Sequence, residues 1–473
     1  MLYEDRYKIL GILLSSLTFY FPILYAGVFF ADDIYRINVE SGGFIWEEQG
    51  RFLATLISYI YGGATNIVID AFPLTWFINI ILLSLSAYLL YKKFSGQKKD
   101  IAIYISLLFI INPFFTYNLY YRFDSIGMNL AVSFVIFSFY IRDTKSNFPL
   151  KVLLLIISLN LYQSAINLYL TIYSFYLFFA YIRDNNKEEF LKNVTLVILS
   201  YSLASALYFV ELKILPMSSR STLVNFDSSL IYIVCKNNIK AISPFIEFWS
   251  YYKWYIIPVI PFSIIGLLIK FRFKYVLPLI LCFFIFILSI LGGLSLLKEG
   301  YYPPRVLNYF PFLLVIIFIG LFNLKLGSKY LILLPIFACF LFNYRVGNVM
   351  RIQNLFEQPI FYSISVDIHK YKDIGKFYVL GSSPLSNFTK NIIEHTPFNA
   401  YLCRLSWNSA FRINEYTSRK IVDEQWGDVH EKIRAEFAKL KADNQLTLLK
   451  DNSPYYCLYK HKNVGYIDWG CNF

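Results

Sequence analysis

The chain has 473 residues, of which 57% are hydrophobic and only 16% are charged, whereas a soluble domain has roughly 45–50% apolar and about 25% charged residues. This composition excludes a soluble globular protein. The net charge of +13 would indicate a nucleic-acid partner in a soluble protein, but here the basic residues gather in short loops between apolar stretches and report membrane orientation, so we expect no nucleic-acid partner.

Apolar segments recur along the first three quarters of the chain. About eleven of them predict transmembrane helices, because each approaches the length needed to cross about 30 Å of hydrocarbon. They lie near 8–30, 72–91, 101–119, 125–141, 150–165, 166–182, 193–212, 254–269, 275–292, 306–323 and 330–344. We therefore expect a polytopic α-helical membrane protein with a transmembrane domain over 1–345. A β-barrel is excluded, because its strands would alternate polar and apolar residues.

The basic residues also predict an orientation in the lipid bilayer. Lys and Arg concentrate in alternate short loops, such as those near 92–99 and 270–274, and such loops stay in the cytoplasm. With the N-terminus in the cytoplasm, the loops over 31–71, 213–253 and 293–305 face the periplasm.

After about Arg345 the long apolar runs stop and all four histidines appear. Residues 346–473 are therefore expected to form a soluble periplasmic domain. KFYVLG and YYCLY are typical of short strands, and EKIRAEFAKLKAD is typical of an amphipathic helix, which together predict a small α+β unit. Cys457 and Cys471 could pair in this compartment or remain thiols, because spacing alone does not fix connectivity.

The first periplasmic segment carries the most suggestive residues. Asp32 and Asp33 directly follow the first apolar run, and Trp46, Glu47 and Arg51 come soon after. Adjacent carboxylates at the edge of a membrane span cost desolvation energy unless they are used. One of them could act as a general base on a hydroxyl, or the pair could hold a divalent cation that bridges a phosphate. The structural alternative is a solvated helix end.

Three further clusters fall on the same predicted face. Arg122 and Asp124 lie among tyrosines, which are more simply explained as membrane-interface residues. The two charged residues either form a structural ion pair or serve a phosphate site. Tyr162 and Gln163 lie at a helical break, where Gln163 either meets a sugar hydroxyl or caps the turn. Arg305 either meets a lipid phosphate or snorkels to the interface.

The coincidence of these clusters on one face indicates a shared cavity. Carboxylates activate hydroxyls, arginines stabilise a departing phosphate and aromatic rings stack on sugars, which fits sugar transfer from a lipid phosphate to a hydroxyl acceptor. The chain has no phosphate-binding G-x-x-x-x-G-K-[ST] loop, no H-E-x-x-H and no Rossmann fingerprint before a helix. The sugar donor is therefore expected to be a lipid.

Five motifs in order resemble a known family. They are DDIYR at 32–36, WEEQGRF at 46–52, YYRFD at 120–124, NLYQSA at 160–165 and PPR at 303–305. The set resembles the serotype-converting O-antigen glucosyltransferases, the glucosyl transferase II group of the GT-C superfamily. The resemblance covers the membrane part, about 1–345, and leaves the tail and the 213–253 loop unmatched.

The resemblance implies an enzyme of the bacterial inner membrane that transfers glucose from undecaprenyl-phosphate-glucose to the O-antigen polysaccharide in the periplasm. It implies functional partnership with a donor-synthesising glucosyltransferase and a small flippase. Asp32 or Asp33 would be the base in an inverting attack, with a divalent cation left open. From charge and topology, we assign Arg122, Arg305 and Arg51 to the donor phosphate, and Asp124, Tyr162, Gln163, Trp46 and Glu47 to substrate binding.

Two other classes share parts of this pattern. An O-antigen polymerase or ligase uses a lipid-linked donor but transfers whole oligosaccharides, so the size of the transferred unit separates it from a hexosyltransferase. A polysaccharide flippase or transporter would carry charged residues near mid-membrane. The predicted spans are mostly free of such residues, which disfavours transport.

Overall fold

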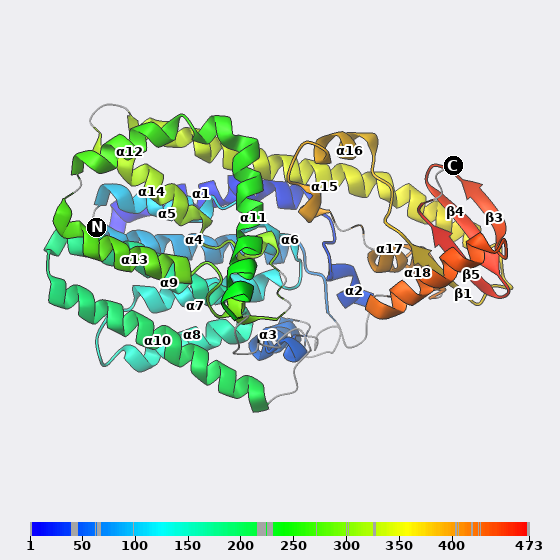
Figure 1. The fold of residues 1–473 in the computed structure, drawn as a ribbon, viewed down its shortest axis with the longest axis horizontal. Coiled ribbons are helices and arrows are strands. Elements are labelled where there is room, and N and C mark those ends of the chain that lie inside the picture. Colours follow the sequence, from blue (N-terminus) through cyan, green and yellow to red (C-terminus); the bar gives the residue numbers. More distant parts are fainter. Residues whose placement is uncertain are drawn as a thin grey trace. The chain divides into compact units, whose positions relative to one another are not determined.

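The computed structural model describes residues 2–38, 46–61, 63, 68–97, 99–214, 224, 230–270, 272–298, 300, 302–324, 328–402, 404, 406–417, 420–423, 425 and 427–470. The chain divides into two compact units, which Figure 1 shows in ribbon form. The first unit comprises Met1–Leu24 and Gly43–Arg345, and the second comprises Tyr25–Gly42 and Val346–Phe473. The second unit therefore takes in a segment from near the N-terminus as well as the expected tail.

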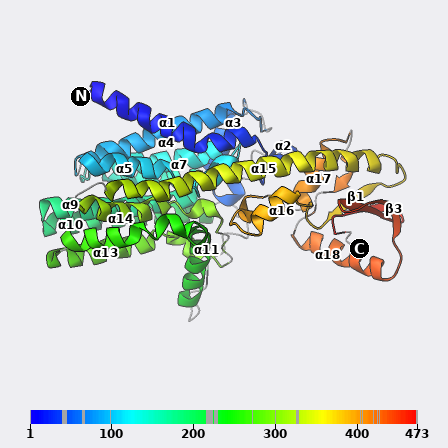
Figure 2. The same ribbon diagram turned by 90° about the horizontal axis from the view of Figure 1, so that it is seen from above.

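The first unit is a bundle of helices joined by short 3₁₀ turns. Its elements are α1 (Leu2–Ala26), η1 (Glu47–Gln49), α3 (Phe52–Tyr61), α4 (Leu74–Ser95), α5 (Lys99–Ile110), α6 (Thr116–Tyr120), α7 (Ser125–Tyr140), α8 (Phe148–Leu161), η2 (Gln163–Ile166), α9 (Asn167–Asp184), α10 (Lys187–Ile214), α11 (Leu230–Ile256), α12 (Val259–Lys270), η4 (Phe273–Tyr275), α13 (Val276–Leu288), η5 (Gly292–Leu296), η6 (Pro304–Val306), α14 (Phe310–Asn323), η7 (Ser328–Ile332) and the start of α15 (Leu333–Ile368). Helix α4 packs against α5 and α7, α7 against α8, and α12 against α14. Figures 1 and 2 show the bundle in two views at right angles. A Cβ at Gly266 would overlap the backbone carbonyl of Gly320, so glycine is what allows α12 and α14 to approach this closely.

Each of the eleven predicted apolar segments overlaps at least one helix, but some, such as 101–119 and 254–269, are divided between two, and the helices differ in length. Among the described residues, five helical stretches are long and apolar enough to cross a membrane: Asp5–Ala26, Leu74–Ser95, Gln163–Asp184, Lys187–Ile214 and Tyr330–Ile368. The pair Leu230–Ile256 and Val259–Ile269, bent by 83°, would make a sixth. The remaining apolar helices have 10–17 residues. A membrane protein is thus supported, and a count of about eleven spans stays a prediction.

Two local features explain where the helices depart from the predicted segments. The segment predicted over 101–119 ends as a helix at Ile110, because Pro113 cannot continue it and the side chain of Asn112 instead accepts the backbone N–H of Phe114 at 3.1 Å. The segment predicted as a loop over 213–253 contains α11, whose direction crosses that of neighbouring helices in Figure 1.

The second unit is a mixed sheet covered by helices on both faces. Its elements are α2 (Asp33–Asn38), the end of α15, β1 (Lys376–Leu380), α16 (Asn387–Ile393), η8 (Asn399–Tyr401), α17 (Ser406–Asn414), β2 (Val422–Asp423), α18 (Gly427–Ala442), β3 (Thr447–Asn452), β4 (Tyr456–His461) and β5 (Val464–Asp468). The strand order is β2-β1-β5-β4-β3, with β1 parallel to β2 and β5, and β4 antiparallel to β3 and β5. The strands and the helix predicted in this tail are confirmed.

The sheet has a separate apolar core on each face. On one face, Phe361 and Ile364 of α15 and Ile413 of α17 pack against buried strand residues. On the other face, Phe437 of α18 packs against Tyr466. The unit therefore has the buried layers that a folded domain needs.

Helix α15 runs through the boundary predicted between membrane and soluble parts. Its 36 residues correspond to about 54 Å at about 1.5 Å per residue, well beyond the roughly 30 Å of a hydrocarbon core. The helix therefore does not end near Arg345, although the composition changes there.

Candidate functional site

The two predicted catalytic carboxylates lie in the second unit, where Asp32 is on a tight turn and Asp33 is the first residue of α2. The backbone of Ala31 has a positive φ of 46°, a conformation that costs a residue with a side chain about 1 kcal/mol or more and is often found at functional sites. The Ala31 carbonyl accepts a hydrogen bond from Asn408 Nδ2 at 3.1 Å. The turn is thus fixed by a residue of α17.

Asp33 and Asp32 have different environments on this turn. Asp33 is buried, and its Oδ2 accepts the backbone N–H of Phe30 at 2.9 Å, as expected of a carboxylate at a helix start. Asp32 is half-buried. Asp33 therefore holds the turn together, while Asp32 is the more accessible carboxylate.

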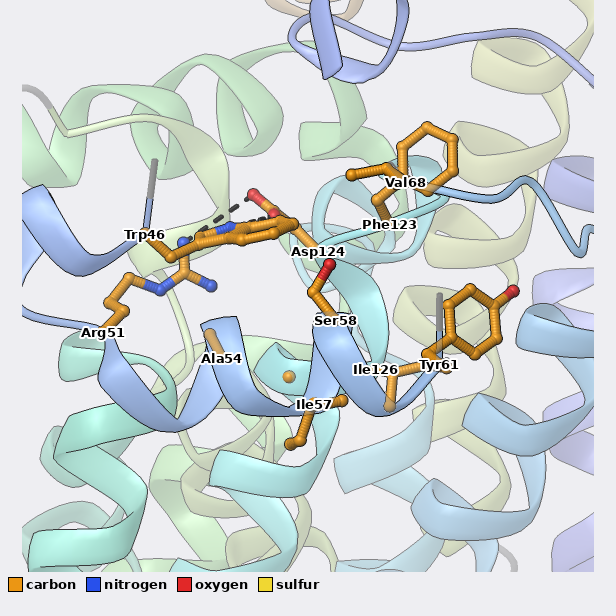
Figure 3. Close-up of a pocket in the computed structure, with 11 residues that line it drawn as sticks. Trp46, Arg51, Ala54, Ile57, Ser58, Tyr61, Val68, Phe123, Asp124 and Ile126 are labelled. Atoms are coloured by element: carbon orange, nitrogen blue, oxygen red, sulfur yellow. Dashed lines mark hydrogen bonds and ion pairs between the residues drawn. The ribbon is translucent and has the colours of Figure 1, made fainter. Parts of the chain in front are cut away.

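The first unit brings Trp46, Arg51 and Asp124 together at the start of α3. Figure 3 shows these three side chains pointing toward one another. Trp46 Nε1 donates a hydrogen bond to Asp124 Oδ1, and Arg51 Nη1 lies 3.7 Å from Asp124 Oδ2. All three residues are buried. A buried carboxylate needs such partners, because an unpaired charge there would be strongly unfavourable.

Groups from α8, η2 and α10 hold this part of the chain in place. Arg51 Nε donates to the Leu161 carbonyl at 2.8 Å, and its guanidinium lies 5.4 Å from the Tyr162 ring centre. Gln163 Nε2 donates to the Gln49 carbonyl at 2.7 Å. The hydroxyl of Tyr208 donates to the Gly50 carbonyl at 2.8 Å. Gln163 thus fixes the backbone next to Arg51, in a segment distant in sequence, rather than capping its own turn.

Arg305, on η6, belongs to the same cluster. Its guanidinium lies 4.8 Å from the Tyr121 ring centre and 5.6 Å from that of Tyr117. Asp124 and Tyr162 are near enough to act on its charge. Within the described part of the chain, Arg305 Nη1 is buried and has no hydrogen-bond partner. A buried guanidinium nitrogen without a partner is ready to bind an acceptor such as a phosphate oxygen.

The other predicted residues lie outside this cluster. Arg122 Nη1 pairs with Asp70 Oδ2 at 2.6 Å, and its guanidinium lies 4.5 Å from the Phe72 ring centre. The Arg122–Asp124 ion pair considered from sequence is therefore replaced by Arg122–Asp70 and Arg51–Asp124. Glu47 is exposed at the start of η1.

Several contributing residues had no role in the sequence prediction. Tyr117 and Tyr121 border Arg305, but in a sequence they look like interface tyrosines. Asp70, Tyr208 and Asn408 each act through a partner at least fifty positions away, so no local pattern identifies them. Contacts of this kind become visible only when the fold is known.

A divalent cation at the carboxylate turn stays a prediction. In the part of the chain that the structure describes, no three His, Cys, Asp or Glu side chains gather in a way that could hold a metal ion. Asp32 and Asp33 supply two carboxylates, of which Asp33 already accepts the Phe30 N–H. A cation here would need further oxygen ligands from substrate or water.

We expect Asp124→Ala to destabilise the protein more than Trp46→Phe. Removing the carboxylate breaks the buried Arg51–Asp124 ion pair, at a cost of about 3–5 kcal/mol. Trp46→Phe keeps the ring and removes one hydrogen bond to Asp124, at a cost of about 1–3 kcal/mol. The midpoint of thermal unfolding, recorded for each purified variant in detergent, measures the loss of stability. Equal midpoints for the two variants would contradict the ion pair as the main stabilising contact.

Comparison with known proteins connects this site to a family. The family described as glucosyl transferase GtrII matches residues 21–322, a range that includes Asp32, Arg51, Asp124 and Arg305. Over 243 residues, the chain is 30% identical to an uncharacterized 55.3 kDa protein in the gtrB 5' region of Salmonella phage P22. That match covers 50% of the chain and 49% of the relative, so it spans about half the length of each. No solved structure matches. Because the family match covers more than half of this chain, the chain belongs to the glucosyl transferase GtrII family.

Proposed function

We propose that the chain transfers a glucosyl residue from undecaprenyl-phosphate-glucose to a sugar of the O-antigen repeat, on the periplasmic side of a bacterial inner membrane. The observation that carries the proposal is the half-buried Arg305, whose Nη1 is buried and unbonded in the described structure, beside the Arg51–Asp124 pair. Membership of a glucosyl transferase family supports the reaction class. The location of the phage relative in a gtrB region supports serotype conversion.

The arginine cluster is suited to the lipid phosphate of the donor. Among the described residues, the guanidinium groups of Arg51 and Arg305 both lie near the Asp124 carboxylate. Arg305 is aligned by the rings of Tyr117 and Tyr121, so it is ordered before substrate arrives. An ordered donor in a dry site stabilises developing negative charge more than a flexible one does. We assign Arg305 to the leaving phosphate and Arg51 to the support of the site.

The carboxylate turn is suited to activation of the acceptor. In the proposed step, Asp32 takes the proton of an acceptor hydroxyl, and the hydroxyl oxygen attacks the anomeric carbon of glucose. The new glycosidic bond forms as the bond from that carbon to the phosphate oxygen breaks. Undecaprenyl phosphate leaves with the electron pair, and the configuration of the anomeric carbon is inverted. Asp33 keeps the turn in shape through its bond to Phe30.

The proposed cellular setting follows from the membrane character of the chain. The apolar helices that could cross a membrane and the basic loops support an inner-membrane protein with its active site facing the periplasm. A lipid-linked donor on that side requires a glucosyltransferase that makes it in the cytoplasm and a flippase that moves it across. These two proteins are the proposed functional partners.

The test is mass spectrometry of the O-antigen repeat from cells that express the chain together with the donor-supplying proteins. We expect a gain of one hexose per repeat, and no gain with the Asp32→Asn/Asp33→Asn double variant, because the base is absent. A changed chain length with an unaltered repeat mass would instead indicate a polymerase or ligase. An unaltered lipopolysaccharide in cells that contain the donor would refute hexosyl transfer to this acceptor.

A further inference from the structure

A pocket lies entirely within the second unit, next to the turn that carries the two carboxylates. Its wall comes from residues 28–30 before the turn, 350–357 of α15, and 401–412 around the start of α17. Phe30 and Asn408 line the pocket. The same two residues hold the turn, since Phe30 N–H donates to Asp33 and Asn408 donates to the Ala31 carbonyl. The pocket and the turn therefore share their framework.

One side of the pocket is held by a closed network around a buried carboxylate. Glu357 forms an ion pair with Arg412 and accepts hydrogen bonds from Gln353 Nε2 at 2.9 Å and Ser383 Oγ at 2.6 Å. The Arg412 guanidinium lies 4.4 Å from the ring centre of Phe361. These bonds neutralise the buried charge and fix the side chains that border the pocket.

Three polar residues in the wall each have one hydrogen-bonding atom to spare. Arg404 uses Nε and Nη2 on the Ser383 carbonyl, which leaves Nη1. Asn354 accepts from Arg412 through Oδ1 at 2.6 Å, which leaves Nδ2. Asn408 donates through Nδ2 to Ala31, which leaves Oδ1. Within the described residues these two donors and one acceptor have no partner, and the ring of Phe29, 37% exposed, lies in the same wall.

We propose that this pocket, whose volume is about 30 Å³, takes a hydroxyl-bearing edge of a sugar residue of the acceptor glycan, an inference that rests on the proposed function. Sugar hydroxyls both donate and accept, so they can use two donors and one acceptor together. The apolar face of a sugar ring packs on an aromatic side chain such as Phe29. A sugar hydroxyl can donate to Asn408 Oδ1, which an anion without a proton cannot do. The binding site thus holds the acceptor beside Asp32.

The wall of the pocket combines residues from inside and outside the segment that matches the GtrII family, and this division bears on which acceptor glycan the chain selects. Residues 28–30 lie within the range that the GtrII family matches, whereas 350–357 and 401–412 lie outside it, because that range ends at 322. The turn that activates the hydroxyl is therefore built from the family segment. Phe29 comes from this same segment, whereas Asn354, Arg404 and Asn408, which supply the polar groups of the wall, come from the part of the chain beyond it.

The test uses the full chain in nanodiscs, with undecaprenyl-phosphate-[¹⁴C]glucose as donor and delipidated O-polysaccharide of the host as acceptor. Asn354→Asp keeps the oxygen that accepts from Arg412 but replaces the spare donor with an acceptor. Phe29→Ala removes the ring. We expect each variant to raise the acceptor KM at least tenfold, with the donor KM unchanged. Gln358→Glu on the same helix and Phe388→Ala on α16, both at exposed positions outside the pocket, are the matched controls and should behave as wild type.

Polysaccharide binding without donor separates this inference from the proposed function. If the wild-type chain binds O-polysaccharide in thermophoresis and both variants bind it at least tenfold more weakly, the pocket is the acceptor site, even if no glucose is transferred. Inorganic phosphate should not compete. Unchanged acceptor KM and unchanged binding in both variants would overturn the inference while leaving the glucosyl transfer intact, and so would competition by phosphate.

Discussion

Replacing Arg305 with alanine should lower kcat/KM for the lipid donor by about 10²–10³-fold, the usual loss when one ordered donor to a developing negative charge is removed. The Arg305 guanidinium lies 4.8 Å from the Tyr121 ring centre and 5.6 Å from that of Tyr117, which hold it in one orientation. Arg305→Lys should recover only part of the loss, since lysine supplies a point charge without the planar fork of arginine. Initial rates at varied donor concentration measure both variants.

The matched control for Arg305 is Lys298→Ala. Lys298 is exposed and lies in the same connection between α13 and α14, so it tests whether loss of any positive charge in this loop lowers the rate. We expect wild-type rates for Lys298→Ala. An Arg305→Ala protein that is folded and turns over normally at every donor concentration would show that Arg305 is structural.

Asp32→Asn should reduce kcat by about 10²–10⁴-fold, the usual contribution of a general base, while the protein stays folded. Asp33→Asn should lose much less activity, because the asparagine Oδ1 can still accept the N–H of Phe30 that Asp33 Oδ2 accepts at 2.9 Å. The two variants are nearly identical in volume and change charge equally. A difference between them therefore reports the role of each carboxylate rather than the local net charge.

The pH dependence of kcat provides a second measurement for this pair. If Asp32 is the base, the wild-type kcat should fall at low pH as the base becomes protonated. This fall should be absent from the residual activity of Asp32→Asn and present in Asp33→Asn. The reverse pattern, with Asp33→Asn inactive and Asp32→Asn active, would exchange the two roles. Full activity in both variants would remove the carboxylate turn from the mechanism.

The positions of the helices could largely be predicted from sequence, because apolar runs record which segments avoid water. The exceptions have local causes. Asn112 and Pro113 end α5 inside an apolar run. In α11, polar residues such as Lys236 and Asn237 interrupt the apolar run, while Asn237 Nδ2 in fact binds the carbonyls of Ser295 and Leu297 at 2.9 Å. Amphipathic helices of this kind do not produce the long runs that identify spans.

The candidate site could be predicted only as a set of residues on one predicted face. Topology assigned Arg51, Asp124 and Arg305 to that face, and the structure brings these three together. The partners within the set depend on packing between distant segments, which is why Arg122 pairs with Asp70 rather than with Asp124. The assignment of residues 25–42 to the second unit likewise depends on contacts such as Tyr35 with Phe411, which no local pattern encodes.

The discontinuous second unit determines when during synthesis the carboxylate turn is completed. Residues 25–42 leave the ribosome early, but the rest of their unit begins at Val346, and Asn408, which fixes Ala31, comes later still. The turn with Asp32 must wait for contacts separated by more than three hundred residues, and such long-range contacts form late in folding. A nascent or truncated chain that stops at Arg345 would contain every residue of the arginine cluster but no assembled acceptor-activating turn. Under the proposed function, transferase activity would then require synthesis at least as far as α17, which carries Asn408.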